Sequence, residues 1–151
     1  MQIAVLNGVN LNLLGRRDPA IYGTLTLHDL ESQVYSWARD AGHSARCFQT
    51  NFEGEFVEHI HDTVGWAEAV IVNPGAWTHY AYAIRDALEF AVQQGLVAVE
   101  VHLSDVAARE EFRRTSVVRD VVQHTICGKG ADGYREAIGW IVERATSGGA
   151  G

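Results

Sequence analysis

The chain has 151 residues, of which 47% are apolar, and this is enough for one domain with a hydrophobic core. Its formal net charge of −7 argues against a general binding surface for the phosphate backbone of nucleic acids. The sequence has no run of 18 apolar residues and no charged-then-apolar leader. We therefore expect a cytoplasmic protein without a membrane segment.

Apolar runs typical of buried strands alternate with helical patterns along the chain. Strands are predicted at Ile3–Asn7, Ser44–Gln49, Ala69–Asn73, Val97–His102 and Gln123–Cys127. Helices are predicted at Leu27–Ala41, Glu53–Gly65, His79–Gln94 and Gly133–Arg144. This alternation predicts an α/β fold with a five-stranded parallel sheet that helices cover on both faces. We expect one domain over residues 1–145 and a disordered tail over residues 146–151.

The first long helix has recognisable signals at both ends. Thr26 precedes it and Asp29 follows three residues later, which is close to the spacing of a capping box. Gly42 follows the last apolar residue of the pattern, as is common at helix C-termini. The helix is therefore expected to begin just after Thr26 and to end before Gly42.

The residues from Leu6 to Gly23 form a loop that is long for a compact domain, which favours a functional role. Arg16 and Arg17 precede Tyr22 by a few residues. A free tyrosine has a pKa of about 10, and lowering it by three units requires roughly 4 kcal/mol. Cationic neighbours in a water-poor site can supply that difference. We therefore expect a catalytic lid that carries Tyr22 as a base.

Polar residues follow four of the predicted strands. They are Asn7–Asn10, Thr50–Asn51, Asn73–His79 and His102–Asp105. Ligands bind outside the carboxyl ends of parallel strands, so these segments are expected to converge at one edge. In the third segment, Gly75 allows close approach of the backbone, Thr78 is a candidate N-cap, and Asn73 offers a donor and an acceptor. An ordinary strand-to-helix turn would explain that segment equally well.

Glu100 and His102 are two residues apart in a predicted strand and therefore share a face. A carboxylate beside an imidazole favours the imidazolium and fixes its tautomer, which suits a general acid. The backbone N–H groups of Leu103 and Ser104 are placed to hold a substrate carboxylate. The alternative is a histidine held by a glutamate for structural reasons, but the pair's position at the carboxyl end of the strand favours catalysis.

The sequence contains no motif for a metal or an organic cofactor. His59 and His61 are two residues apart on a predicted helix, so they do not share a face and make a poor metal pair. Gly128–Gly130 is not a Walker loop, and no G-x-G-x-x-G motif follows a strand. The charge run Arg109–Arg114 is typical of a solvated face, from which one arginine can point back toward a site. We therefore predict neither a metal nor a cofactor.

Seven sequence blocks, in order along nearly the whole chain, resemble the type II 3-dehydroquinate dehydratases. The first is NG-x-NLNLLG-x-R-x-P-x-x-YG over residues 7–23. The others are QTNFEGE (49–55), NPGA-x-TH (73–79), A-x-RDA (83–87), EVHLS (100–104), ARE-x-FR (108–113) and ICG-x-G-x-x-GY (126–134). The resemblance implies a flavodoxin-like three-layer sandwich with strand order 2-1-3-4-5.

The resemblance also implies an activity and an assembly. The expected reaction is the reversible loss of water from 3-dehydroquinate to give 3-dehydroshikimate, in the shikimate or quinate pathway. Members of this family need no metal and no organic cofactor. They commonly form trimers grouped into dodecamers, so a homo-oligomer is expected.

The roles of individual residues follow from the same resemblance. Tyr22 is the implied general base that removes the C2 proton, and Arg17 keeps that tyrosine ionised. Asn10, with a bound water, steadies the enolate. His102 is the implied acid that protonates the departing C1 hydroxyl, and Glu100 orients it. The implied substrate-binding residues are Asn73, His79, Leu103, Ser104 and Arg113, together with Asp86 from a neighbouring subunit.

The chemistry of this reaction agrees with the residues. The C2 proton of a β-hydroxyketone is only weakly acidic, so its removal needs a strong base and a stabilised enolate oxygen. A covalent imine mechanism would instead need a reactive lysine. Lys129 is the only lysine of the chain and lies in a glycine-rich turn, so the imine mechanism is disfavoured.

Some positions depart from the family pattern. Val9 stands where proline is usual, which loosens the loop that places Asn10. Asp105 stands where asparagine is usual, and its carboxylate would repel a substrate carboxylate unless it faces solvent or a helix N-terminus. The remaining departures are Tyr80 and Ala81 in place of a small hydroxylic pair, Ala107 where histidine is common, and a longer segment between Asp86 and Glu100.

Three alternatives remain open. A paralogue for a modified substrate, such as aminodehydroquinate, would use the negative charge of Asp105 to attract a cationic amine. A flavodoxin-like binding module, for FMN or as a signalling receiver, would need a hydroxyl-rich phosphate loop or an acidic cluster after the first strand, and neither is present. An inactive scaffold is disfavoured because the whole set of candidate residues is retained.

Overall fold

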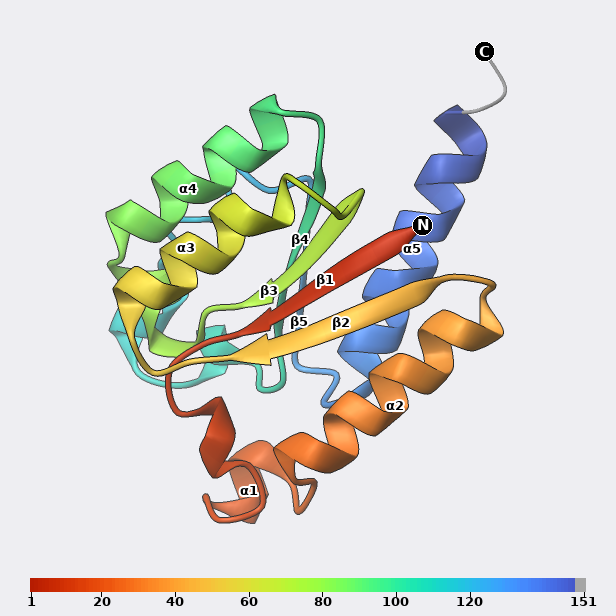
Figure 1. The fold of residues 1–151 in the computed structure, drawn as a ribbon. Coiled ribbons are helices and arrows are strands. Elements are labelled where there is room, and N and C mark those ends of the chain that lie inside the picture. Colours follow the sequence, from red (N-terminus) through yellow and green to blue (C-terminus); the bar gives the residue numbers. More distant parts are fainter. Residues whose placement is uncertain (149–151) are drawn as a thin grey trace.

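The computed structural model describes residues 1–148, with the exception of the side chain of Tyr22. Its centre is a five-stranded sheet in the order β2-β1-β3-β4-β5, and every neighbouring pair of strands is parallel (Figure 1). The strands are β1 (Gln2–Asn7), β2 (Ser44–Gln49), β3 (Ala69–Asn73), β4 (Val97–His102) and β5 (His124–Cys127). The predicted parallel sheet and its strand order are confirmed.

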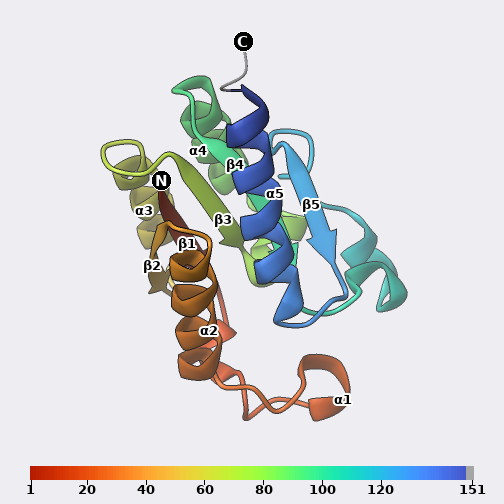
Figure 2. The same cartoon turned by 90° about the vertical axis from the view of Figure 1, so that its right-hand side faces the viewer.

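Two long helices cover each face of the sheet (Figure 2). They are α2 (Leu27–Asp40) and α5 (Asp132–Gly148) on one face, and α3 (Glu53–Thr63) and α4 (Tyr82–Gln93) on the other. Because side chains alternate along a strand, Ile3 and Val5 belong to the core under α2 and α5, whereas Ala4 and Leu6 belong to the core under α3 and α4. The fold is the three-layer flavodoxin-like sandwich that the resemblance implies.

The start and the end of α2 confirm the sequence signals. Thr26 Oγ1 accepts a hydrogen bond from the N–H of Asp29 over 3.1 Å, and the Asp29 carboxylate accepts one from the N–H of Thr26 over 3.2 Å. This is a complete capping box. Gly42 follows the helix with a φ of +83°, a conformation that glycine adopts without the steric cost of a Cβ atom.

The start of α4 differs from the prediction. The helix begins at Tyr82 rather than at His79, because Gly75–His79 form a separate 3-10 turn, η2. Thr78 is therefore not the N-cap of α4; Ala81 occupies that position and makes no side-chain cap. The hydroxyl of Thr78 bonds instead to the carboxylate of Glu100. A contact in the folded site thus overrides a local helix-capping preference.

The long loop after β1 contains two short helical turns, η1 (Leu11–Leu13) and α1 (Pro19–Tyr22). Asp18 caps α1, since its carboxylate accepts a hydrogen bond from the N–H of Ala20 over 3.0 Å. In both ribbon views α1 projects beyond the carboxyl ends of the strands (Figures 1 and 2). The loop therefore lies at the edge of the sheet where a ligand is expected.

The last helix is longer than predicted. α5 continues to Gly148, so it includes the first three residues of the expected tail. The rest of that expected tail, residues 149–151, lies outside the described residues. Within residues 1–148, no helix is both long and apolar enough to cross a membrane.

Candidate active site

A cavity lies at the carboxyl edge of the sheet, where the sequence predicts the site. Its lining comes from the loops after β1, β3 and β4 and from the 3-10 turns η3 (Val106–Ala108) and η4 (Glu111–Arg114). Eight predicted site residues line it: Asn10, Arg17, Asn73, His79, His102, Leu103, Ser104 and Arg113. The other lining residues are Val9, Leu11, Gly75, Ala76, Val106 and Arg109.

Two glycines let the loops after β1 and β3 approach each other. A Cβ atom on Gly8 would lie 2.6 Å from the carbonyl oxygen of Pro74, and one on Gly75 would lie 2.7 Å from the carbonyl oxygen of Val9. Gly75 also has a φ of +64°, which favours glycine independently. The N–H of Gly8 donates to the carbonyl of Asn73 over 2.8 Å and joins the two loops. Val9, in place of the usual proline, is accommodated in this contact.

Asn10 is held in an unusual backbone conformation at the cavity. Its φ is +68°, which asparagine tolerates better than most residues with a side chain. Its N–H donates to Oδ1 of Asn51 over 2.8 Å, and Gln49 Nε2 donates to the same oxygen over 3.1 Å. Residues at and just beyond the end of β2 thus fix the loop that carries Asn10, even though the proline is missing.

Glu100 and His102 form a buried pair at the end of β4. Nε2 of His102 donates to Oε2 of Glu100 over 2.6 Å. Only 4% of His102 and none of Glu100 is exposed, yet His102 reaches the cavity lining. The predicted arrangement of both side chains on one face is confirmed. The carboxylate lies behind the imidazole, where it can orient the ring and stabilise its protonated form.

Three hydroxyl groups surround the Glu100 carboxylate on its remaining sides, and we call them the hydroxyl cage. Thr78 Oγ1 donates to Oε2, Ser116 Oγ lies 3.1 Å from both oxygens, and Thr125 Oγ1 lies 3.4 Å from Oε1. The sequence analysis missed this cage. Thr78 fits a helix cap in the sequence, Ser116 lies in no predicted element, and Thr125 lies in the predicted strand Gln123–Cys127 with no signal for a contact with a carboxylate.

His102, with help from two hydroxyl groups of the cage, keeps Glu100 ionised despite its burial. Burial acts to raise the pKa of Glu100, but the hydrogen bond and charge of His102, with the bonds from Thr78 and Ser116, outweigh it. The pKa therefore lies below the ordinary value of 4.5. A carboxylate that stays charged at neutral pH can support a protonated His102.

Thr78→Val is expected to weaken this support without changing the shape of the side chain. Loss of one donor raises the pKa of Glu100 and lowers the free energy of unfolding at pH 7 by about 1–3 kcal/mol. The pKa of Glu100 is lower in the folded state than in the unfolded chain. Ionised Glu100 therefore stabilises the fold above pH 4.5, and this contribution is lost as the pH falls below that value. The stability difference between wild type and variant should therefore shrink on acidification, as measured by urea unfolding.

Thr63→Val is the matched control for this prediction. Thr63 is equally buried, and its hydroxyl donates within α3 to the carbonyl of His59 over 2.7 Å, with no carboxylate involved. The loss of stability in Thr63→Val should stay the same between pH 3 and 7, whereas the loss in Thr78→Val should shrink as the pH falls. A pH-independent loss in both variants would contradict the role assigned to the cage.

His79 lines the cavity as a neutral imidazole. Burial lowers the pKa of His79, and the nearby charges of His102 and Arg113 act in the same direction, while the hydrogen bond to Thr115 opposes them. Nδ1 lies 2.7 Å from the carbonyl oxygen of Thr115, so this nitrogen carries the proton and donates it. Nε2 is then the acceptor of the ring, which suits contact with a hydroxyl group of a ligand.

The lining of the cavity is rich in arginine although the chain as a whole is acidic. Arg17, Arg109 and Arg113 all contribute to its lining. Among the described residues that line it, none is aspartate or glutamate. Three guanidinium groups of this kind favour a ligand that carries a carboxylate. Arg109 was not distinguished within its charge run by the sequence analysis, whereas Arg113 was predicted.

Asp86 and Asp105, two residues singled out in the sequence, lie outside the lining of the described cavity. Asp86 is exposed on α4 and is absent from the lining. Asp105 is also exposed and outside the lining, and its Cβ atom lies against Gly128. The side chain of Tyr22 lies outside what the structure describes, although α1 places its backbone at this edge.

Lys129 lies apart from the cavity. Its exposed ammonium group pairs with Glu136 over 2.6 Å, and the residue is absent from the lining. Among residues 1–148, no group of three or more His, Cys, Asp or Glu side chains is arranged to hold a metal ion. The side chains that are present thus provide acid–base groups and anion-binding groups.

The fold and the site together define an α/β protein with a buried carboxylate–imidazole pair under an arginine-lined cavity. The chain belongs to the class II dehydroquinase family, whose sequence model matches residues 1–142. A curated 3-dehydroquinate dehydratase of Pelobacter propionicus is 49% identical over 138 residues, which cover 91% of each chain.

Solved structures show the same relationship. The type II dehydroquinase from Propionibacterium acnes superposes with a TM-score of 0.89 at 44% identity, covering 94% of this chain and 96% of the other. The type II dehydroquinase from Butyrivibrio crossotus superposes with a TM-score of 0.90 at 38% identity, covering 95% and 97%.

Proposed function

We propose that this protein dehydrates 3-dehydroquinate to 3-dehydroshikimate. The observation that carries the proposal is the buried Glu100–His102 pair beneath a cavity lined by three arginines. The reaction needs an acid for a departing hydroxyl and a binding site for a carboxylate, and these groups are suited to both tasks. Membership of the class II dehydroquinase family supports the same substrate.

The first chemical step removes the C2 proton of the substrate. Tyr22, in α1, acts as a tyrosinate and takes this proton, while the guanidinium of Arg17 favours the ionised phenol. The electrons of the broken C–H bond delocalise into the neighbouring carbonyl and form an enolate. Asn10, held by Asn51 at the cavity, supplies an amide to steady the enolate through a bound water.

The second step expels the C1 hydroxyl. His102 donates a proton to the leaving oxygen, so water departs and the C1–C2 double bond forms as the enolate reverts to the ketone. Since Nε2 of His102 is bonded to Glu100, Nδ1 is the nitrogen through which the imidazolium delivers the proton. The charge of Glu100 stabilises the imidazolium before the transfer. A net return of the proton from Tyr22 to His102 restores the starting state.

Substrate recognition uses the rest of the cavity. The backbone N–H groups of Leu103 and Ser104 and the guanidinium of Arg113 bind the carboxylate. His79 and Asn73 contact the hydroxyl groups of the ring. Asp86 reaches the site from a neighbouring subunit in a cytoplasmic homo-oligomer, built of trimers and extending to a dodecamer. Its exposed position on α4 is compatible with such a role.

The reaction can be followed directly by ultraviolet absorbance, because dehydration creates an enone conjugated with a carboxylate. Purified protein mixed with 3-dehydroquinate should produce a rising signal with a kcat on the order of 1–10³ s⁻¹. Prior treatment with a chelator should leave the rate unchanged. Folded protein that gives no signal at millimolar substrate would refute the proposed function.

A further inference from the structure

A second hydrogen-bond chain lies under the cavity, on the opposite face of the sheet from Glu100. It joins Asn7 at the end of β1, Asn73 at the end of β3 and Tyr134 in the first turn of α5. The hydroxyl of Tyr134 donates to Oδ1 of Asn7 over 2.6 Å and accepts from Nδ2 of Asn73 over 2.9 Å. All three residues are at least 97% buried. The mechanism described above uses neither Asn7 nor Tyr134.

The direction of this chain is fixed at Gly75. The N–H of Gly75 donates to Oδ1 of Asn73 over 3.2 Å, and a backbone N–H can only donate. Asn73 must therefore turn Oδ1 toward Gly75 and Nδ2 toward Tyr134. The single hydroxyl proton of Tyr134 is then left for Asn7. Gly75 itself cannot shift easily, because it packs against the backbone of Val9.

The far end of the chain carries an unsatisfied donor. Nδ2 of Asn7 is buried and has no hydrogen-bond partner among the described residues. If the chain ran in reverse, Nδ2 of Asn7 would donate to Tyr134, and Tyr134 would donate to Asn73. That arrangement would satisfy Asn7 but would set Nδ2 of Asn73 against the N–H of Gly75. The N–H of Gly75 therefore sets the orientation of Asn73, and Asn7 takes the orientation that follows from it.

We propose that Tyr134 is a positioning residue, which fixes the carboxamide of Asn73 so that the cavity is offered an N–H donor. One N–H of Asn73 is bonded to Tyr134, and the second N–H remains for a hydroxyl or carbonyl oxygen of the substrate. Burial raises the pKa of Tyr134 far above its ordinary value, so the phenol stays protonated and keeps its role as a donor. This inference rests on the proposed function for the identity of the substrate.

A double-mutant cycle tests whether Tyr134 acts through Asn73. In Tyr134→Phe, only Gly75 still holds the Asn73 carboxamide, so KM for 3-dehydroquinate should rise about three- to tenfold while kcat changes much less. In the Asn73→Ala background, the same substitution should leave KM unchanged, because the group that it positions is absent. Equal effects in both backgrounds, or no effect in either, would overturn the proposal.

Two further variants make the test specific. Tyr35 lies in α2, outside the cavity lining, and its phenol oxygen accepts a hydrogen bond from the backbone N–H of Cys47 over 3.2 Å. Tyr35→Phe removes this oxygen and should leave KM unchanged. Should Tyr134→Phe fail to fold, Asn7→Leu replaces it. That variant frees the Tyr134 proton for Oδ1 of Asn73 and should also raise KM; an unaltered KM would count against the proposal.

Urea unfolding of the wild type, Tyr134→Phe, Asn73→Ala and the double variant tests this inference independently of the proposed function. If the wild type turns over no 3-dehydroquinate, the proposed function fails. The hydrogen-bond chain is then judged by the coupling between Tyr134 and Asn73 in the unfolding free energies. Non-additive losses support the assigned orientation, and strictly additive losses refute it.

Discussion

Tyr22→Phe is expected to lower kcat by about 10²- to 10⁴-fold, because it removes the phenol proposed as the base for the first step. The substitution deletes one oxygen from a residue in the short helix α1, and its neighbours Ile21 and Gly23 are exposed. The fold should therefore be unaffected. We expect KM to change little, since the proposed role of the phenolate is to remove the C2 proton in the transition state rather than to hold the bound substrate.

Steady-state kinetics by ultraviolet absorbance, together with circular dichroism, measure this effect. Tyr35→Phe is the matched control, because its phenol lies outside the cavity lining, and this variant should retain the wild-type kcat. A Tyr22→Phe protein with near-normal turnover would show that another group removes the proton. A Tyr35→Phe protein that also loses activity would mean that the effect is not specific to the site.

His102→Gln is expected to lower kcat by a similar factor of about 10²- to 10⁴-fold. A glutamine amide can still donate a hydrogen bond to Glu100, so the buried carboxylate keeps a partner and the protein should fold. The amide cannot deliver a proton to the leaving hydroxyl. The kcat of the variant, measured by ultraviolet absorbance over pH 5 to 9, should therefore lie below that of the wild type at every pH.

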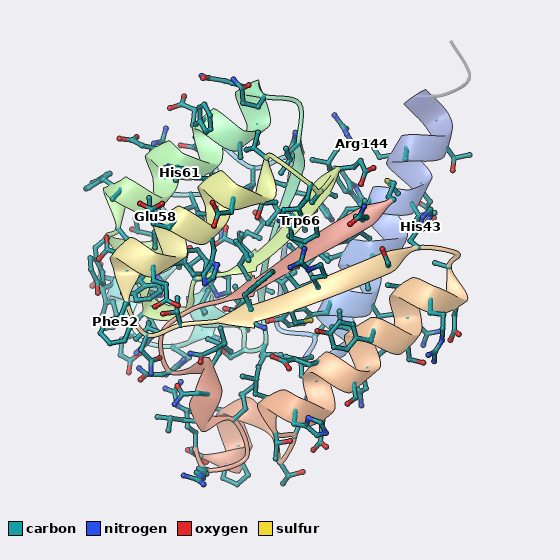
Figure 3. The ribbon with its side chains drawn as sticks, viewed as in Figure 1. His43, Phe52, Glu58, His61, Trp66 and Arg144 are labelled. Carbon is teal, nitrogen blue, oxygen red and sulfur yellow. The ribbon has the colours of Figure 1, made fainter. Side chains whose placement is uncertain are left out.

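His61→Gln is the control for His102→Gln. His61 is exposed on α3 (Figure 3). It packs edge-on against Phe90 of α4 and is absent from the cavity lining. It should retain the wild-type rate and pH profile. If His102→Gln keeps its turnover, the C1 hydroxyl leaves by another route and the role proposed for the pair is wrong.

The fold could be predicted because its signals are local. The bounds of β2, β3 and β4 follow from apolar runs of the right length, and the capping box of α2 follows from residues three positions apart. The start of α4 could not be predicted in this way. Thr78 is a good helix-capping residue by itself, and only the folded site reveals that its hydroxyl is needed by Glu100.

The candidate site could likewise be predicted only where its signals are local. Glu100 and His102 could be paired from strand alternation alone, and the structure confirms the pair. Ser116 and Thr125 act through hydrogen bonds to Glu100, which lies 16 and 25 positions away from them in the chain. No periodicity or spacing rule reports contacts of that kind, so these supporting residues become visible only in three dimensions.

A comparison of kcat/KM for 3-dehydroquinate and for aminodehydroquinate decides which substrate the cavity is built to accept. Three arginines line the cavity, whereas the Asp105 carboxylate is exposed outside it, so Asp105 gives a cationic amine no attraction and the arginines repel it. We predict a preference for 3-dehydroquinate of more than about tenfold. Equal values, or a preference for the amine, would contradict the account and indicate a paralogue with a modified substrate.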